Sequence, residues 1–518
     1  MSTENSRKRI ATNTLMLYIR MIFTMLASLY TSRIVLNVLG VEDFGIYNIV
    51  GGVVVLFSFF NNAMTSATQR FLTYELGKKD FIQLKRMFSM SMTTHISIII
   101  VILILAETIG LWFLNTQINI PEERLVAANW VYQFSILAFC FQIIQVPYSA
   151  SIIAFEKMSV YAYISIFEVA FKLLVVLLLK YIPFDKLATY SISISFASFL
   201  TFMVYRMFCK RKFDITHYHF FWDKKLYKQL MSFSGWSLFG QISFISANQG
   251  INILLNIFYK VTLNAALGIA NQVNSALVGF VSNFQTAFKP QITKSFACGD
   301  KEYMYQLIFQ TSKISYFLLY ILAIPILFNI EYLLQLWLKI VPDYTAIFCK
   351  LIIIYSLIEA ISGPLWMSVF ATGHIRNYQI VIGIVILSNL LLSYIFLKLG
   401  FAPQVVLWIR IFINVLVLIM RIFYAHKMVH LQRFAYIQNV ILPITGVTVL
   451  SLPLPFWLHK YAENFIGVLF TSLIYILMIM LCIYFIGMTK LEKRYVNGLI
   501  YRYFNKISKL IPICKHMN

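Results

Sequence analysis

Ionisable side chains inside long apolar segments are the residues of this chain that could do chemistry. A charge near the middle of a bilayer costs at least about 2.5 kcal/mol, so it usually faces a cavity or a partner. The cations in such segments are Arg20, Arg33, Lys172, Lys313, Lys350 and Arg410, and the acids are Glu107, Glu168 and Glu359. The excess of cations predicts an internal cavity suited to an anion, and it weighs against a cavity built for cationic drugs.

Arg20 and Arg410 lie deepest in their segments, and each shares a helical face with polar residues. We therefore expect both to bind the anion. Arg33, Lys172 and Lys313 are open candidates for the same role. Arg33 and Lys313 lie near segment ends, where a long side chain can reach the membrane surface, and Lys172 can pair with Glu168 four residues earlier.

Two buried acids are candidates for coupling transport to a proton. A carboxyl group in a low-dielectric environment can exchange a proton near neutral pH, and Glu359 and Glu168 lie in corresponding regions of the two halves of the chain. The alternative is a carboxylate neutralised by a neighbouring cation. That cation would be Lys172 for Glu168 and an unidentified residue for Glu359.

Polar side chains recur at spacings of three, four or seven within several segments, which places them on one helical face. They predict the wall of a water-filled cavity, although inter-helix hydrogen bonds worth about 0.6 kcal/mol each are the alternative. The residues expected to line the cavity are Asn48, Asn62, Gln69, Gln241, Asn248, Asn252, Asn271, Ser275 and Gln285.

Signals for catalysis, metals and cofactors are weak. The chain contains no Gly-x-x-x-x-Gly-Lys-[Ser/Thr] motif for binding a nucleotide. The histidine pairs His217/His219 and His426/His430 lie in basic, aromatic segments typical of solvated helix ends. The six cysteines are scattered without a Cys-x-x-Cys pair. We expect neither a metal nor a cofactor, and no enzymatic activity.

The elements that must position these residues are membrane spans. Hydrophobic residues make up 60% of the 518 residues and charged residues 12%, and a span needs roughly 20 mostly apolar residues. About fourteen segments qualify by this criterion, which predicts an all-α integral membrane protein. They lie near 13–38, 46–68, 88–114, 125–153, 159–181, 187–208, 231–258, 263–288, 303–329, 345–370, 377–398, 402–424, 437–458 and 465–488.

The chain repeats itself. Gly45–Val50 is echoed by Gly268–Val273, and Pro147, Ala154 and Tyr161 recur with the same spacing as Pro364, Ala371 and Tyr378. Duplicated bundles are a common build of secondary transporters. We expect six-helix bundles at 1–210 and 231–430, a linker at 211–230, and an added helix pair with a basic tail at 431–518. Pro147 and Pro364 are expected to kink equivalent helices.

Lys and Arg are concentrated in alternate loops, on the same side as both chain ends. This asymmetry predicts an even number of spans with both termini in the cytoplasm. It also accounts for most of the net charge of +23, because these groups face an anionic lipid leaflet and not nucleic acid.

Leu36–Tyr47, which reads LNVLGVEDFGIY, closely resembles the first outer loop of bacterial polysaccharide repeat-unit flippases. These are the O-antigen and capsule exporters of the multidrug/oligosaccharidyl-lipid/polysaccharide (MOP) superfamily. Looser similarity to their inner loops occurs at Gln69–Phe71 with Gly77–Asp80, at Ala154–Met158 and at Ala371–His374. The likeness covers about residues 10–430. The family typically has about twelve spans, so the final pair departs from its pattern.

The resemblance implies a two-bundle flippase in the bacterial inner membrane. It would carry undecaprenyl-diphosphate-linked oligosaccharides across by alternating access, driven by H⁺, Na⁺ or the membrane potential. Arg20, Arg410, Arg33, Lys172 and Lys313 would then hold the diphosphate, because arginine matches phosphate geometry. Membrane lipids and other polysaccharide-assembly proteins would be its partners. Alternatives are a multidrug antiporter, a lipid II flippase or, from another class, a membrane glycosyltransferase or polymerase.

Overall fold

The structure is a computed structural model that describes residues 3–55, 58–116, 120–181, 183–259, 261–338, 341–458, 460, 464–490, 492–494 and 497–498. Within these residues the chain is helical and has no strand, and twelve helices are long and apolar enough to cross a membrane. This confirms the predicted all-α membrane class.

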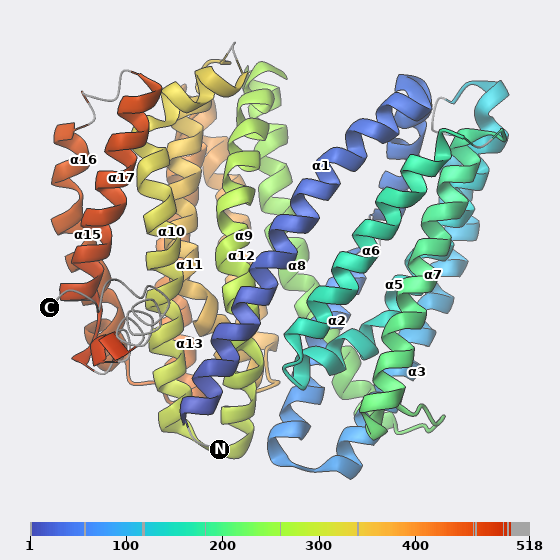
Figure 1. Ribbon diagram of the computed structural model, residues 1–518, viewed down its shortest axis with the longest axis horizontal. Helices are drawn as coiled ribbons and strands as arrows, with labels where there is room; N and C mark the ends of the chain where they lie inside the picture. Colours follow the sequence, from blue (N-terminus) through green and yellow to red (C-terminus); the bar gives the residue numbers. More distant parts are fainter. Residues whose placement is uncertain are drawn as a thin grey trace, which may run out of the picture.

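The helices form two halves and a C-terminal addition (Figure 1). The N-terminal half contains α1 (Thr3–Val55), α2 (Ser58–Lys78), α3 (Phe81–Leu105), α4 (Leu111–Thr116), α5 (Leu125–Ala154), α6 (Met158–Leu179) and α7 (Lys186–Lys212). The C-terminal half contains α8 (Lys224–Tyr259), α9 (Val261–Cys298), α10 (Lys301–Leu338), α11 (Thr345–Ala371), α12 (Arg376–Lys398) and α13 (Val405–Val429). The addition contains α14 (Arg433–Tyr436), α15 (Leu442–Ser451), α16 (Pro453–Leu458) and α17 (Phe465–Cys482).

Twelve spans meet the length and hydropathy criterion in the described residues, where the sequence predicts about fourteen. The predicted spans at 46–68 and 231–258 are the two that fail it. The span at 46–68 contains residues 56–57, which lie outside the described residues, so no continuous described helix covers it. In the span at 231–258, polar side chains such as Gln241 and Asn248 lower the mean hydropathy. The 36 residues of α8 extend over about 54 Å, which exceeds the ~30 Å thickness of a hydrocarbon core.

One face of the molecule carries the N-terminal end of α1 together with the α2–α3, α5–α6, α9–α10 and α11–α12 turns (lower edge of Figure 1). We call it the basic face, because most of the loop lysines and arginines lie on it. The ribbons of the two halves meet at this face and diverge toward the opposite face. The arrangement is therefore V-shaped.

The apolar cores follow the same division. Near the opposite face each half has its own cluster, one around Val131 and Leu187 and the other around Leu255 and Phe348. At the basic face two clusters join both halves. One includes Phe88 of α3 and Val369 of α11, and the other includes Leu17 of α1 and Phe284 of α9. Burying apolar surface between the halves at one end only stabilises closure there and leaves the other end free to separate.

α1 is interrupted at Gly40, which has φ 81° and ψ 173°. Few residues other than glycine adopt this backbone conformation. The break lies at the opposite face, where Asp43 just beyond it forms an ion pair with Arg124. Arg124 also binds Asp185 at 2.6 Å. The Arg124 guanidinium thus links three segments of the N-terminal half: the part of α1 after Gly40, the start of α5 and the start of α7.

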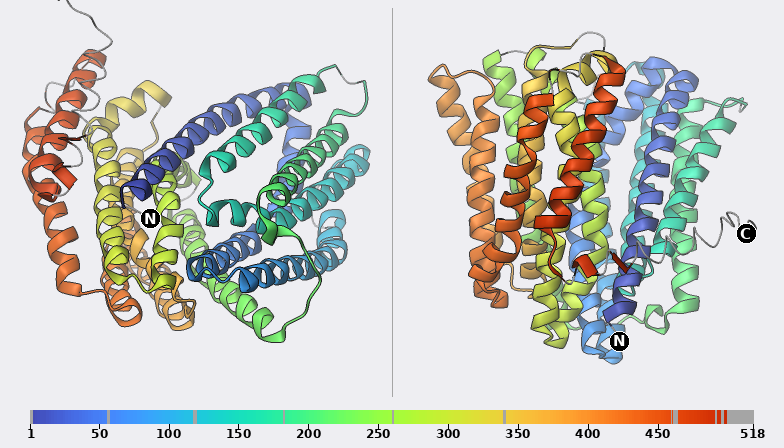
Figure 2. Two further views of the ribbon diagram at one scale, coloured as in Figure 1. Left: turned by 60° about the horizontal axis from the view of Figure 1, so that its bottom comes forward. Right: turned by 60° about the vertical axis from the view of Figure 1, so that its left-hand side comes forward.

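The C-terminal addition packs on the outer side of the second half, away from the first (Figure 2). Its helices lie against α10, where the Tyr316 hydroxyl contacts Thr448 Oγ1 at 2.8 Å. Lys313 of α10 is buried and forms an ion pair with Glu492 at 2.9 Å. The predicted position of these helices outside the repeat agrees with this packing.

The two repeated prolines do not interrupt their helices. α5 continues through Pro147 and α11 through Pro364, and no residue of either helix is recorded with non-helical dihedrals. The interruption in this half instead lies in α10 at Asn329, with φ −110° and ψ 15°, one turn after Pro325. The Asn329 amide donates to the Pro325 carbonyl at 2.9 Å. The expected kinks at Pro147 and Pro364 are therefore not seen as breaks in the backbone.

Replacing Gly40 with alanine should destabilise the N-terminal half, because a Cβ at this positive φ costs about 1–3 kcal/mol. Thermal unfolding of the purified protein should show a lower Tm. Gly45→Ala is the matched control, since Gly45 has neither a positive φ nor an atom within 4 Å of its ideal Cβ. An equal Tm for the two variants would contradict the argument.

Candidate functional site

The C-terminal half contains a buried polar cluster that joins α11, α12 and α13. The Arg410 guanidinium lies over the Tyr355 ring, 4.1 Å from its centroid. One turn along α13, the Asn414 amide donates to the Tyr355 carbonyl at 3.0 Å. Two more turns along, Arg421 binds the Glu359 carboxylate at 2.8 Å, and Tyr378 of α12 lies close enough to interact with its charge. The spacing 410, 414 and 421 places these α13 side chains on one helical face.

The cluster surrounds a cavity of about 30 Å³, to which Asn248 and Asn389 also contribute. A cavity of this size can hold a water molecule. Two guanidinium groups face one carboxylate here, so the site carries net positive charge. The Arg421 side chain is only 9% exposed, and its Nε has no hydrogen-bond partner among the described residues. The geometry therefore provides unused donors for an anion or for water.

Sequence reasoning missed the position of Arg421. Arg421 lies near the end of the predicted span 402–424 and is absent from the cations expected to face a cavity, whereas α13 continues to Val429 and buries it. Its partner is Glu359, for which the sequence identified none. The shared face of Arg410, Asn414 and Arg421 is the signal that could have found it.

The N-terminal half has a smaller cluster of related composition. Arg20 of α1 lies over the ring of Tyr161 of α6, 4.7 Å from its centroid, and its buried Nε has no partner among the described residues. Lys172 pairs with Glu168 at 2.6 Å, as the alternative interpretation of both residues expects. Tyr161 and Tyr378 are equivalent in the repeat. Each half thus places an arginine against the same tyrosine position.

The remaining candidates for binding an anion are dispersed. Arg33 is exposed, and Lys313 is held by Glu492 and by the Gly487 carbonyl. Both lie apart from the clusters of Arg20 and Arg410, which themselves occupy different halves. The five predicted cations therefore do not form one site in this structure.

The residues predicted to line a cavity differ in where they lie and in how exposed they are. Asn248 borders the C-terminal cavity, and Asn62 and Ser275 are exposed. Gln241, Asn252 and Asn271 are half-buried. The side chain of Asn48 lies outside the described part of the chain.

Gln285 has a packing role in place of the expected cavity-lining role. It is buried, and its amide donates to Ser315 Oγ and to the Ala360 carbonyl, both at 3.0 Å. Gln69 reaches across the halves, where its amide oxygen accepts a hydrogen bond from Lys289 Nζ at 3.3 Å. Inter-helix hydrogen bonding is therefore the better account of both residues.

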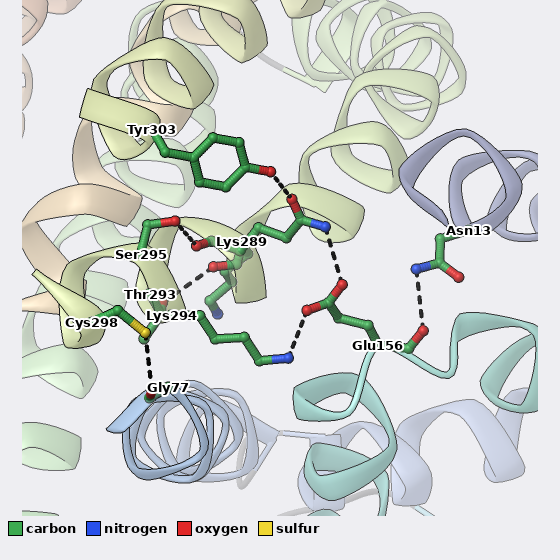
Figure 3. Close-up of polar contacts among 10 residues, drawn as sticks. Asn13, Gly77, Glu156, Lys289, Thr293, Lys294, Ser295, Cys298 and Tyr303 are labelled. Carbon is green, nitrogen blue, oxygen red and sulfur yellow. Dashed lines mark hydrogen bonds and ion pairs between the residues drawn. The ribbon is translucent and has the colours of Figure 1, made fainter. Parts of the chain in front are cut away.

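The two halves are fastened together at the basic face by a polar contact around Glu156 (Figure 3). Glu156 lies in the α5–α6 turn with a positive φ of 58°. Its carboxylate accepts hydrogen bonds from Lys294 at 2.6 Å and from Gln291 at 3.1 Å, both on α9. The exposed fraction of the carboxylate side chain is 1%. This contact is an ion pair between the halves.

A second contact mirrors the first. Arg70 of α2 donates from Nε and Nη2 to the Ala371 carbonyl at 3.2 and 2.8 Å, beside the α11–α12 turn. Gly373 in that turn has a positive φ of 82° and is the repeat equivalent of Glu156. Each half thus uses a long helix to hold the corresponding turn of the other. We call these two contacts the reciprocal latch.

Solved structures of MATE transporters have the same fold. The crystal structure of a MATE mutant matches with a TM-score of 0.70 at 12% identity, over 82% of this chain and 96% of that one. A structure described as the outward-facing conformation of a multidrug resistance MATE family transporter of the MOP superfamily matches with a TM-score of 0.68, also at 12% identity and with the same coverage. A MOP superfamily transporter from Pyrococcus furiosus, described as having a binding pocket of reversed polarity, matches with a TM-score of 0.65 at 13% identity and 82% and 96% coverage.

No family model and no curated protein matches the chain. At these identities the likeness establishes the MATE-like fold with its two pseudo-symmetric halves.

Glu359 and Arg421 should be energetically coupled. Glu359→Gln leaves a buried guanidinium without its carboxylate, and Arg421→Gln leaves the carboxylate without its guanidinium. Glu359→Gln should cost about 3–5 kcal/mol of unfolding free energy, because the guanidinium that it leaves unpaired is buried. Arg421→Gln should cost less, because the Glu359 side chain is 34% exposed to solvent. The double variant should lose clearly less than the sum, as measured by a double-mutant cycle of denaturant or thermal unfolding. Additive losses would show that the pair is not coupled.

Breaking the reciprocal latch should open the basic face. Lys294→Gln removes the cation that holds Glu156, so the population with separated turns should rise. Spin labels attached to cysteines at positions 81 and 301 would report this as a longer distance component. Phe81 and Lys301 are both exposed and lie in different halves. The exposed Cys298 is first replaced by serine so that it is not labelled. Lys301 is the first residue of α10 and lies outside the latch, so the labelled protein without the Lys294→Gln change is the reference. An unchanged distance distribution in Lys294→Gln would refute the latch.

Proposed function

We propose that this chain is a flippase for a lipid-linked oligosaccharide diphosphate in the bacterial inner membrane. The observation that carries the proposal is the excess of guanidinium over carboxylate groups inside the two halves. Arg20, Arg410 and Arg421 face the interior of their bundles, and Glu359 is the acid of the C-terminal cluster. Guanidinium groups present planar donors that match the oxygens of a diphosphate.

An apolar groove supports the same substrate class. It has a volume of about 580 Å³ and lies between α1, α9, α10 and the segment that follows α17, near the basic face. Tyr18, Phe284 and Phe317 are among the residues that line it, with Lys313 and Glu492 as its charged residues. A substrate with a long hydrocarbon chain needs such a surface, while its charged and sugar groups need a polar path.

The closed basic face and the divergent opposite face correspond to one end of an alternating-access cycle. By the positive-inside pattern the basic face is cytoplasmic, and this state is open to the outside. In the cycle the latch would break, the basic face would open, and Arg20 and Arg410 would be reached from the cytoplasmic leaflet. The membrane potential or an ion gradient would supply the energy. A role for Glu359 in coupling would require its ion pair with Arg421 to open.

A multidrug antiporter is the second candidate. One of the matching structures is a multidrug resistance transporter, and the Glu359 side chain, which is 34% exposed, is a carboxylate that a cationic drug could contact. The binding pocket of reversed polarity described for another neighbour is consistent with a fold that accepts either sign of charge. The cationic balance of this chain favours the anionic substrate.

Arg410→Ala should abolish export of the glycan while leaving protein levels unchanged, because a charged hydrogen bond worth about 1.5–3 kcal/mol is lost. That loss corresponds to roughly ten- to hundredfold weaker substrate binding. Arg20→Ala should have a similar effect. The measurement is the amount of lipid-linked oligosaccharide on each leaflet in a deletion strain complemented with each variant.

Two controls accompany this test. Arg410→Lys should retain part of the activity, and Arg211→Ala, which changes an exposed residue at the end of α7, should be silent. Normal export in both Arg20→Ala and Arg410→Ala would overturn the proposed substrate. Drug efflux that depends on Glu359 would favour the antiporter.

A further inference from the structure

The two contacts of the reciprocal latch differ in one respect. In the first, the turn itself supplies an anion, because Glu156 extends a carboxylate to Lys294 and Gln291. In the second, the equivalent position is Gly373, which has no side chain. A Cβ placed on Gly373 would lie 2.7 Å from Arg70 Nη2 and 2.8 Å from its Cζ. The Arg70 guanidinium therefore occupies the place where the turn would present an acid.

A cavity of about 1010 Å³ opens beside this second contact. Its described lining comes from both halves of the chain: from α2 and the start of α3 in the first half, and from α8, the α11–α12 turn, the start of α12 and the end of α13 in the second. Six cations line it, namely Arg70, Lys78, Lys225, Lys228, Arg376 and Lys427. The single carboxylate of its described lining is Glu75.

None of these six cations forms an ion pair with a carboxylate of the described residues. Aromatic rings hold three of them instead. Arg70 lies 4.5 Å from the Tyr74 centroid and Lys78 lies 4.6 Å from the same ring. Arg376 lies 5.2 Å from the Trp236 centroid. Cation–π contacts orient a charge without neutralising it, so the positive charge of the cavity is preserved.

We propose that this cavity is a binding site for a phosphate-bearing anion that takes the place of the acid missing at Gly373. Multiple guanidinium and ammonium groups that converge from several sides suit the several oxygens of a phosphate or diphosphate. The volume admits a phosphate group together with an attached body, which Trp236, Tyr378 and Tyr424 could contact. A soluble phosphate compound and an anionic lipid headgroup share this chemistry.

The site is complete only while the basic face is closed. Arg70 and Lys78 belong to the first half and the other four cations to the second, so separation of the halves divides the site. A ligand that contacts both halves binds the closed state more tightly and shifts the population toward it. The anion would therefore act as a regulator of the conformational equilibrium, separate from the arginines inside the bundles. The proposal does not depend on which molecule is transported.

Titration of the purified protein with inorganic diphosphate, in nanodiscs of zwitterionic lipid, tests this. Binding should saturate, raise the Tm and shorten the distance between spin labels at Phe81 and Lys301. In Lys228→Gln/Arg376→Gln the apparent affinity should fall about tenfold or more, because charged hydrogen bonds are lost. Lys85→Gln/Arg86→Gln is the matched control, since it removes two exposed cations of α3 outside the cavity lining. The control should bind like the wild type.

A second arm distinguishes the sources of the phosphate. Nanodiscs that contain an anionic phospholipid should produce the same shifts if a lipid headgroup is the ligand, with the same loss in Lys228→Gln/Arg376→Gln. A response to either source supports the site. The proposal is overturned if neither source stabilises the closed state. It is also overturned if the cavity variant and the control respond alike, which would mean an adventitious ion only.

Discussion

The contact between the halves at the basic face is the constraint on which the rest of this structure depends. Apolar packing there joins α3 to α11 in one cluster, and the reciprocal latch adds directed polar contacts through Glu156 and Arg70. When the two halves are closed at the basic face, they are separated at the opposite face, because each half has a core of its own there. The shape of the molecule therefore follows from where its shared core lies.

Each half stabilises the charged groups inside its bundle with its own carboxylate and aromatic partners. In the C-terminal half, Glu359 neutralises Arg421, and the Tyr355 ring faces Arg410. In the N-terminal half, the Tyr161 ring faces Arg20, and Glu168 pairs with Lys172. Full neutralisation would make either cluster a purely structural element. The unpartnered nitrogens of Arg20 and Arg421 are what make these clusters candidates for function.

Much of the fold could be predicted from the sequence, because hydrophobic length and repetition are local signals. The helical class, the duplication and the separate C-terminal addition all follow from them. The pairing of Arg421 with Glu359 and the role of Glu156 could not be predicted, because both depend on partners more than 60 residues away. The polar helix α8 and the break at Gly40 show the other limit. Mean hydropathy falls where a helix carries a polar stripe, and it contains no information about a backbone dihedral.

The latch also has a consequence for the order in which the chain is assembled. Arg70 binds the carbonyl of Ala371, so about 300 residues must be synthesised before the first partner meets the second. At about 5–20 residues per second, the first bundle waits roughly 15–60 seconds for its counterpart. Arg70 spends that interval without the contact that buries it, and Glu156 waits about half as long, because Lys294 follows it by 138 residues. Their location at one membrane face, and not inside the bilayer, makes the delay tolerable, because water can solvate both groups until the second bundle arrives.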